Sequence, residues 1–531
     1  MKTLYVILVA LMFLVCGISA AGSGTSADIS ESEAGTRIFD NTTYLNANSV
    51  FMFFTNTGLY SRDIDGVFGY EYGMFYPYTS IADIENGTNS KSLLYSAGIW
   101  LGGLVNGQLR VSLAEFGSEF WPGPMAGSTY VADADTIAAY RMYKLYRDSM
   151  STNPNTDYLE WPDSLGAPVD HHGDPRLSGD QMLWAVFNDA NPARHTLNDG
   201  STEPLGIEVR QLSWEGTSWV FDRIIYVEYK LYNRGPNEIT DFYIGVFDDP
   251  DLGWIDDDLF GCDTLANEFF VYNADNEDNF YGTAPPAFGV KLLCGPLVPS
   301  SGDTARFGDS KIPDYRNLPM TSYVRYVNGT DPQNPQEVYN LLQGLSQDGS
   351  PLPNGTRYSF PGDPIAGTGD LDPFGGNKHC VMGMGPFDFH PGDSQYVLIK
   401  IAVGHGLDNI GSLANLRYVL AYPNNYPTDA PDEGGEELPD RFSLSQNYPN
   451  PFNPTTVIKF SLPTRSEVSL EVFNVLGQKV KSLVNGELPA GEHSVTWDGT
   501  DRSGNREPSG VYFYRLKAGN YVQSRKMVLV R

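Results

Sequence analysis

Residues 441–531 constrain the fold of this chain more than any other segment. They begin with a run at 447–456 whose prolines exclude a helix, because each proline fixes φ and restricts the residue before it. Alternating or aromatic-rich runs then follow at 457–462, 468–473 and 511–516, as strands require. Glycine-containing turn sequences separate these runs. Several short strands at this spacing predict a small Ig-like β-sandwich.

Five phrases of this segment occur in the order of a known family: residues 447–456 (NYPNPFNPTT), 473–478, 497–499, 509–516 and 526–527. Together they resemble the type A C-terminal sorting domain of the type IX (Por) secretion system, whose fold is related to the Ig-like domain of the flagellar hook-capping protein. The residues that carry the motif are Asn447, Pro449, Pro451, Phe452, Asn453, Pro454, Gly477, Trp497, Asp498, Gly499, Gly510, Tyr512 and Tyr514.

The resemblance implies an export route and a partner but no chemistry. In that family the outer-membrane secretion machinery recognises the domain, which is often removed as the passenger is released or anchored. The family's domain has no catalytic residues. The chain is therefore expected to be secreted, or held on the outer-membrane surface of a Gram-negative-type bacterium.

The N-terminus predicts a secretory signal peptide over residues 1–21. Met1-Lys2 gives a positive start, residues 4–15 are apolar, and Ser19-Ala20-Ala21 supplies small residues for cleavage. The apolar run is too short to span a bilayer, and no later run approaches the roughly 20 apolar residues that a span needs. We expect no transmembrane segment in the mature chain.

Charge divides the chain at the same place as the motif. Residues 441–531 carry a net charge of +5, whereas residues 1–440 carry −35, which gives −30 for the whole chain. So acidic a surface argues against nucleic acid as a partner, because phosphate binding needs clustered Lys and Arg. Residues 428–440 have almost nothing to bury and are expected to form a linker between the passenger, residues 22–427, and the sorting domain.

The passenger is expected to be an all-β, β-sandwich-type unit, either single or divided near residue 235. Asn106-Gly107 suits a tight turn between strands at 96–104 and 108–113. Further β-branched and aromatic runs predict strands at 206–214, 223–232, 241–247 and 395–403. Helices are expected only at 140–147 and 412–422.

Closely spaced carboxylates after the strand at 241–247 suggest a cation site. Calcium takes six to eight oxygen ligands from flexible loops, although the spacing here is not that of an EF-hand. The alternative is a solvated acidic loop in an already acidic protein. The candidate calcium ligands are Asp248, Asp249, Asp251, Asp256, Asp257, Asp258 and Asp263, and no other cofactor is expected.

Three cysteines remain once the signal peptide is removed: Cys262, Cys294 and Cys380. Cys262 and Cys294 flank one turn-rich segment and are the pair expected to form a disulfide, although connectivity does not follow from sequence alone. The alternative is that all three are buried small residues.

No catalytic residue is predicted. The sequence has no G-x-S-x-G elbow, no phosphate loop and no dinucleotide fingerprint after a strand. His379-Cys380 matches no known thiol-protease signature. The leading hypothesis is a non-enzymatic surface protein, structural or adhesive. The rival is a secreted carbohydrate-active enzyme or polysaccharide-binding protein with an extracellular glycan as partner, because glycoside hydrolysis uses two distant carboxylates that leave no short signature.

Overall fold

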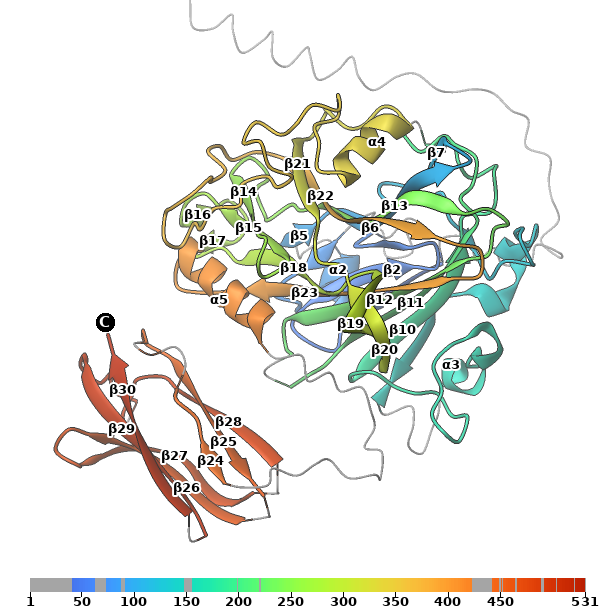
Figure 1. Cartoon of the computed structure of the whole chain (residues 1–531). Helices are drawn as coiled ribbons and strands as arrows, with labels where there is room; N and C mark the ends of the chain where they lie inside the picture. The colour runs from blue at the N-terminus through green and yellow to red at the C-terminus, as the bar shows by residue number, and fades with distance from the viewer. Residues whose placement is uncertain are drawn as a thin grey trace, which may run out of the picture. The chain divides into compact units, whose positions relative to one another are not determined.

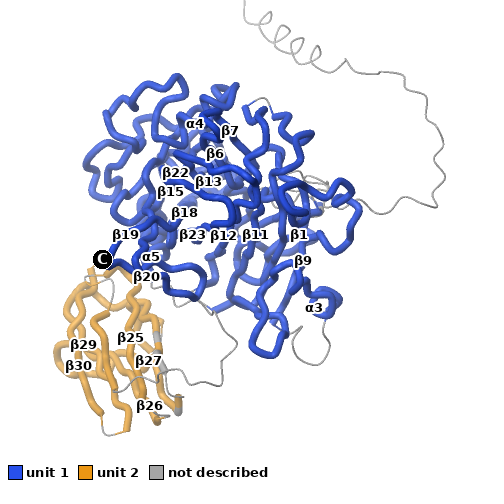
Figure 2. Tube along the Cα trace, turned by 45° about the vertical axis from the view of Figure 1, so that its right-hand side comes forward, with its two compact units in different colours: residues 1–428 blue, residues 429–531 orange. Residues whose placement is uncertain are grey.

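A computed structural model describes residues 41–62, 73–86, 91–147, 155–197, 199–218, 221–422, 442–447, 450, 452–463, 466–488, 491–502, 504–519 and 521–530. The chain forms two compact units, Met1–Thr428 and Asp429–Arg531 (Figure 2). The expected signal peptide and the expected linker lie outside the described residues. Within these described ranges, no helix is long and apolar enough to cross a bilayer.

The first unit is built on two large antiparallel sheets (Figure 1). The ten-stranded sheet runs β21-β22-β13-β6-β3-β2-β4-β5, with β1 on β2 and β7 on β6. Its strands are β1 (Thr42–Leu45), β2 (Phe51–Thr55), β3 (Leu59–Tyr60), β4 (Met74–Phe75), β5 (Ser92–Leu94), β6 (Ser96–Val105), β7 (Gln108–Leu113), β13 (Ile239–Asp249), β21 (Ser322–Val327) and β22 (Lys378–Phe389).

The nine-stranded sheet runs β14-β15-β18-β23-β12-β11-β10-β8, with β9 on β10. Its strands are β8 (Trp121–Pro122), β9 (Tyr143–Tyr146), β10 (Gln181–Asn188), β11 (Ile207–Glu215), β12 (Ile224–Asn233), β14 (Asp258–Asp263), β15 (Glu268–Asn273), β18 (Ala287–Cys294) and β23 (Ser394–Gly404). Two short separate hairpins, β16 (Glu277–Asp278) with β17 (Gly282–Thr283) and β19 (Leu297–Phe307) with β20 (Ser310–Asn317), complete the strands of this unit.

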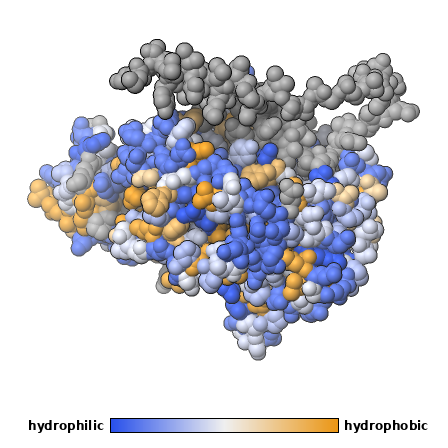
Figure 3. Space-filling model, turned by 90° about the horizontal axis from the view of Figure 1, so that it is seen from above, coloured by the Kyte–Doolittle hydropathy of each residue, from blue (hydrophilic) through white to orange (hydrophobic). Residues whose placement is uncertain are grey.

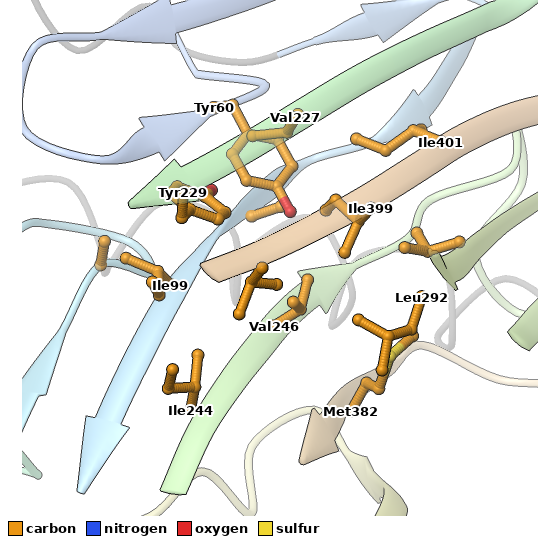
Figure 4. Close-up of a cluster of buried hydrophobic side chains, with 14 of the residues drawn as sticks. Tyr60, Ile99, Val227, Tyr229, Ile244, Val246, Leu292, Met382, Ile399 and Ile401 are labelled. Atoms are coloured by element: carbon orange, nitrogen blue, oxygen red, sulfur yellow. The ribbon is translucent and has the colours of Figure 1, made fainter. Parts of the chain in front are cut away.

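The main core lies between the two sheets. Val227 and Ile399 of the nine-stranded sheet meet Ile244, Val246 and other side chains of the ten-stranded sheet there (Figure 4). Successive residues of a strand point to opposite faces. The even-numbered neighbours Ile224 and Tyr226 therefore belong to a second apolar cluster on the outer face of the nine-stranded sheet.

Helices and hairpins cover the outer faces of both sheets. Helix α5 (Asn409–Ala421) packs on β15, β18 and β23, and α4 (Pro335–Leu342) packs on β6, β7, β13, β21 and β22. Two other helices are short, α2 (Ile81–Glu85) and α3 (Thr156–Leu159). Because both faces are covered, long strands such as β10 are buried at every position. Hydrophilic residues dominate the face seen in Figure 3, where hydrophobic residues occur in separate small areas.

Local sequence patterns correctly predicted a turn and a helix of the first unit, and wrongly predicted a second helix. The turn Asn106-Gly107 has φ of 53° and 75° and joins β6 to β7 as predicted. Helix α5 confirms the helix expected at 412–422. The helix expected at 140–147 is wrong: Tyr143–Tyr146 is strand β9, which pairs with β10. Tyr143 and Leu145 pack into the outer apolar cluster, so tertiary burial overrides a weak local propensity.

The described part of the first unit shows no division near residue 235. Strands β12 and β13 lie on either side of that position and belong to the two facing sheets. Both contribute side chains to the same core. A boundary between them would expose that core on both sides.

The second unit consists of two small antiparallel sheets, β24-β25-β28 and β27-β26-β29-β30. Its strands are β24 (Ser443–Leu444), β25 (Thr456–Leu462), β26 (Ser466–Asn474), β27 (Lys479–Leu488), β28 (Gly491–Trp497), β29 (Gly510–Ala518) and β30 (Tyr521–Leu529). One apolar cluster fills the space between the sheets. The predicted all-β fold class is therefore confirmed for both units.

Candidate functional site

The acidic segment begins at the end of β13, where Asp248 and Asp249 point to opposite faces of the sheet. Asp248 lies on the face that bears Ile244 and Val246, inside the main core. Asp249 lies on the face that bears Phe247. Since neighbouring side chains of a strand diverge, these two carboxylates cannot share one ion as the sequence analysis expected.

Asp248 is a fully buried carboxyl group without a hydrogen-bond partner. Its exposed fraction is 0%, and neither carboxylate oxygen accepts a hydrogen bond from the described residues. The described ionisable groups that interact with it are the hydroxyls of Tyr60 and Tyr229, the thiol of Cys380 and the carboxylate of Asp249. Burial raises the pKa of Asp248 well above its ordinary value, so the group is held neutral inside the core.

Asp249 belongs to a histidine–carboxylate array. Its Oδ1 lies 3.2 Å from Nε2 of His379, and Nδ1 of His379 lies 2.8 Å from Oδ1 of Asp331. The neighbouring imidazole of His379 lowers the pKa of Asp331. His379 is buried and both of its ring nitrogens face carboxylates. Neither ring nitrogen makes a well-oriented hydrogen bond within the described residues, and the imidazole lies at ion-pair distance from a carboxylate of β13 and from one in the segment after β21.

A second pair of carboxyl groups lies close by and was missed by sequence reasoning. Glu115 and Asp199 are both buried and hydrogen-bonded to each other. Burial, followed by the repulsion of neighbouring carboxylates, raises the pKa of Glu115 well above normal. Burial raises the pKa of Glu119 to about 9, although the Leu113 N–H donates to it at 3.1 Å. No local pattern links these residues, because the fold brings together distant segments.

The loop between β13 and β14 contains the remaining predicted ligands. Asp258 accepts a hydrogen bond from Leu252 N at 3.1 Å through Oδ2, while its Oδ1 is buried without a partner. One buried oxygen each of Asp251 and Asp257 also has no hydrogen bond from the described residues. Burial raises the pKa of Asp251 to about 7. The Lys378 ammonium lies beside Asp258: its Nζ donates to Asp258 O at 3.0 Å and pairs with Asp372 at 2.7 Å.

The seven predicted calcium ligands do not form one closed site. Asp263 forms an ion pair with Arg417, and Asp256 is exposed. In the part of the chain that the structure describes, no group of three or more His, Cys, Asp or Glu residues is placed to hold a metal. Among the described residues, one buried oxygen each of Asp251 and Asp257 in the loop, and of Asp258 at the start of β14, has no hydrogen bond. A cation there would need backbone carbonyls or water to complete its shell.

The three cysteines are free and buried, so the structure does not form the predicted disulfide. Cys262 on β14 belongs to the main core, whereas Cys294 on β18 belongs to the outer cluster. Strand β15 lies between β14 and β18. Two thiols on opposite faces of a sheet, one strand apart, cannot meet without movement of the backbone.

In the second unit, the residues of the predicted sorting motif hold the entry segment against the sandwich. Asn447 N donates to the Tyr514 hydroxyl at 2.7 Å, and that hydroxyl donates to Ser445 O at 2.6 Å. Asn447 Nδ2 donates to Thr456 Oγ1 at 2.9 Å. Further along, Phe452 N donates to Val528 O at 3.0 Å. Pro449 and Pro451 lie outside the described residues.

The remaining motif residues form turns and the centre of the core. Gly477 and Gly499 adopt φ of 74° and 66°, a region that favours glycine. Asp498 is exposed, and hydrogen bonds from Lys481 and Thr500 lower its pKa to about 2. Trp497 is fully buried, with its ring 5.6 Å from that of Phe452 and 5.1 Å from that of Tyr512. These positions are architectural and contain no catalytic arrangement.

Comparison with known proteins identifies this sandwich. Residues 450–521 match the FlgD Ig-like domain family. The second unit therefore contains a C-terminal FlgD Ig-like domain. No curated protein matches the chain. The family match covers the second unit alone, so the function of the first unit is not established by it.

Among solved structures, FlgD from P. aeruginosa is 29% identical over 14% of this chain and 58% of its own, with a TM-score of 0.12. Latent PorU from Porphyromonas gingivalis is 11% identical over 67% of this chain and 33% of its own, with a TM-score of 0.15. PorZ, a surface component of the type IX secretion system of the same organism, is 9% identical over 95% and 61%, with a TM-score of 0.13. The chain spans less than two thirds of each of these proteins, and TM-scores this low do not establish a shared fold.

Proposed function

We propose that the type IX secretion system exports this chain and that residues 441–531 are the sorting domain its machinery recognises. The observation that carries the proposal is the match of residues 450–521 to the FlgD Ig-like domain family. The sorting-motif phrases lie in and around this domain. In this proposal, the acidic first unit is the passenger and reaches the cell surface or the medium.

The passenger is proposed to be non-enzymatic, with a structural or adhesive role. The two-sheet core and its covered outer faces support this, since a surface protein needs mainly a stable scaffold. The arrangement of the buried ionisable side chains also supports a non-enzymatic role. His379 and the hydrogen-bonded pair Glu115 and Asp199 are all buried, out of reach of a large substrate.

Truncation tests the export route. A chain that ends at residue 440 lacks the domain that the secretion machinery is proposed to recognise. It should therefore accumulate in the periplasm and be absent from the cell surface and the medium. The measurement is immunodetection in periplasmic, surface and medium fractions. The full-length chain in a strain without the secretion machinery is the control and should accumulate in the same way. Surface display of the truncated chain would contradict the proposal.

We also propose that calcium braces the loop between β13 and β14 through Asp251 and Asp258, with backbone carbonyls and water completing its shell. Their buried, unpartnered oxygens support this role. Calcium at about 100 times its Kd should stabilise the full-length chain by about 2.7 kcal/mol. Asp258→Asn should abolish the rise in melting temperature on adding calcium, whereas Asp256→Asn, at an exposed position, should keep it. An equal rise in melting temperature in both variants, or no rise in the parent chain, would contradict the calcium proposal.

A further inference from the structure

A small pocket lies where the outer apolar layer of the nine-stranded sheet ends. Its volume is about 290 Å³, and its polar lining comes from Glu208 and Arg210 of β11, Arg234 just after β12, and Ser164. Glu208 and Arg210 lie on the same face of β11 as Leu212 and Trp214, which are buried in the outer cluster. This face of β11 therefore carries two charged side chains at the start of the strand and two buried apolar ones further along.

The pocket has an excess of positive charge in a strongly acidic unit. Glu208 Oε1 accepts from Arg210 Nη2 at 3.2 Å and lies 3.4 Å from Arg234 Nη2. Its Oε2 accepts from Met125 N at 3.1 Å. Both guanidinium groups also lie over the Tyr232 ring, at 4.7 and 4.8 Å from its centroid. Two guanidinium groups share one carboxylate, so the centre of the pocket keeps one net positive charge.

The Arg210 guanidinium is held in place before any ligand arrives. Gly166 has a φ of 95°, and a Cβ at that position would lie only 2.0 Å from Arg210 Nη1. The absence of a side chain there makes room for the guanidinium. Arg210 Nε is buried and has no hydrogen-bond partner among the described residues. The Arg210 side chain is still 22% exposed and that of Arg234 39%, so the accessible edges of two planar guanidinium groups can bind a carboxylate through parallel hydrogen bonds.

We propose that this pocket binds the carboxylate of a single acidic sugar ring, such as a uronate unit, with Arg210 and Arg234 as the anion-binding residues. The volume is at the small end for ligand pockets, which fits one ring. Met125 and Leu165 supply apolar walls for the C–H face of the ring, and Ser164 offers a hydroxyl for its polar edge. The proposal concerns the first unit alone and does not depend on the export route.

Calorimetric titration of the full-length chain tests the proposal with three probes: galacturonate, galactose and galactose 6-sulfate. Galacturonate should bind at least about tenfold more tightly than galactose, because only galacturonate makes the charged hydrogen bonds. Arg210→Gln should weaken galacturonate binding by about tenfold or more. Glu208→Gln should strengthen it, because the competing carboxylate is removed.

The controls separate binding from folding. Arg147→Gln removes an exposed arginine that pairs with Asp180 outside the pocket and should leave binding unchanged. Arg234 is more exposed than Arg210, so Arg234→Gln provides a second test if Arg210→Gln does not fold. Equal affinity for galacturonate and galactose, no binding of galacturonate, or unchanged affinity in a folded arginine variant would overturn the proposal. Tighter binding of galactose 6-sulfate than of galacturonate would overturn the assignment to a carboxylate.

Discussion

Trp497→Ala is expected to lower the stability of the C-terminal Ig-like domain by about 3–5 kcal/mol, the usual cost of truncating a fully buried tryptophan. Trp497 has an exposed fraction of 0% and packs between Phe452 and Tyr512. Its Nε1 also donates to Thr500 O at 2.9 Å, so the substitution removes a hydrogen bond as well as the ring. In a domain of this size the loss should lower the melting temperature by about 12 °C or more.

Because this domain is the proposed export signal, the same substitution should also reduce the amount of passenger at the cell surface. Calorimetry of the full-length chain and fractionation of cells give the two measurements. Val522→Ala is the matched control, since Val522 is 57% exposed on β30, outside the sorting-motif phrases, and its truncation should change stability by less than about 0.5 kcal/mol. Wild-type stability of Trp497→Ala would show that the ring is not at the centre of this core.

Asp248→Asn is expected to raise the free energy of unfolding of the first unit by about 1–3 kcal/mol at pH 7 and to change it little near pH 4. Asp248 is fully buried, and burial raises its pKa in the folded state. A carboxyl group with a raised folded-state pKa gives its full contribution to stability below the unfolded-state pKa of about 3.9. That contribution is lost as pH rises through the folded-state pKa.

The physical reason is that the folded chain must keep a proton on Asp248 that the unfolded chain releases. Among the described residues, the ionisable groups that interact with Asp248 are Tyr60, Tyr229, Cys380 and Asp249, and none of these is a cation. Asparagine has a similar shape and stays neutral at every pH, so the difference between the two chains isolates this proton. Urea unfolding between pH 4 and pH 9, with a calcium chelator present, measures it.

Asp256→Asn is the matched control for this series, because Asp256 lies at an exposed position of the neighbouring loop. It should leave the pH dependence of unfolding as in the parent chain. A stability difference between Asp248→Asn and the parent chain that does not grow with pH would show that Asp248 is ionised in the folded protein. It would then need a partner that the geometry does not provide.

Sequence reasoning succeeded where the signal was local. The alternation in residues 457–462 and 468–473 corresponds to strands β25 and β26, and Asn106-Gly107 forms the predicted turn. The prediction failed for β9, because the extended conformation of its four residues is set by pairing with β10 and by burial of Tyr143 and Leu145. Short segments carry too little intrinsic preference to resist such packing.

The groups that define the chemistry of the first unit could not be found from the sequence. Asp249, Asp331 and His379 come from distant segments and meet because β22 pairs with β13 on one side and, on the other, with β21, which precedes Asp331. The predicted pairing of Cys262 with Cys294 failed for a related reason. The order β14-β15-β18 and the face of each cysteine depend on register across a whole sheet, which composition and spacing do not determine.

The most direct test of the account is whether the second unit can export a foreign passenger. Residues 429–531, a compact unit of the structure, would be fused to a periplasmic reporter enzyme that carries its own signal peptide. The location of reporter activity would be measured in a bacterium with the type IX system and in a strain that lacks it. The account predicts reporter activity at the surface or in the medium only when the system is present. Reporter activity confined to the periplasm of both strains would contradict the assignment of this domain as a sorting signal.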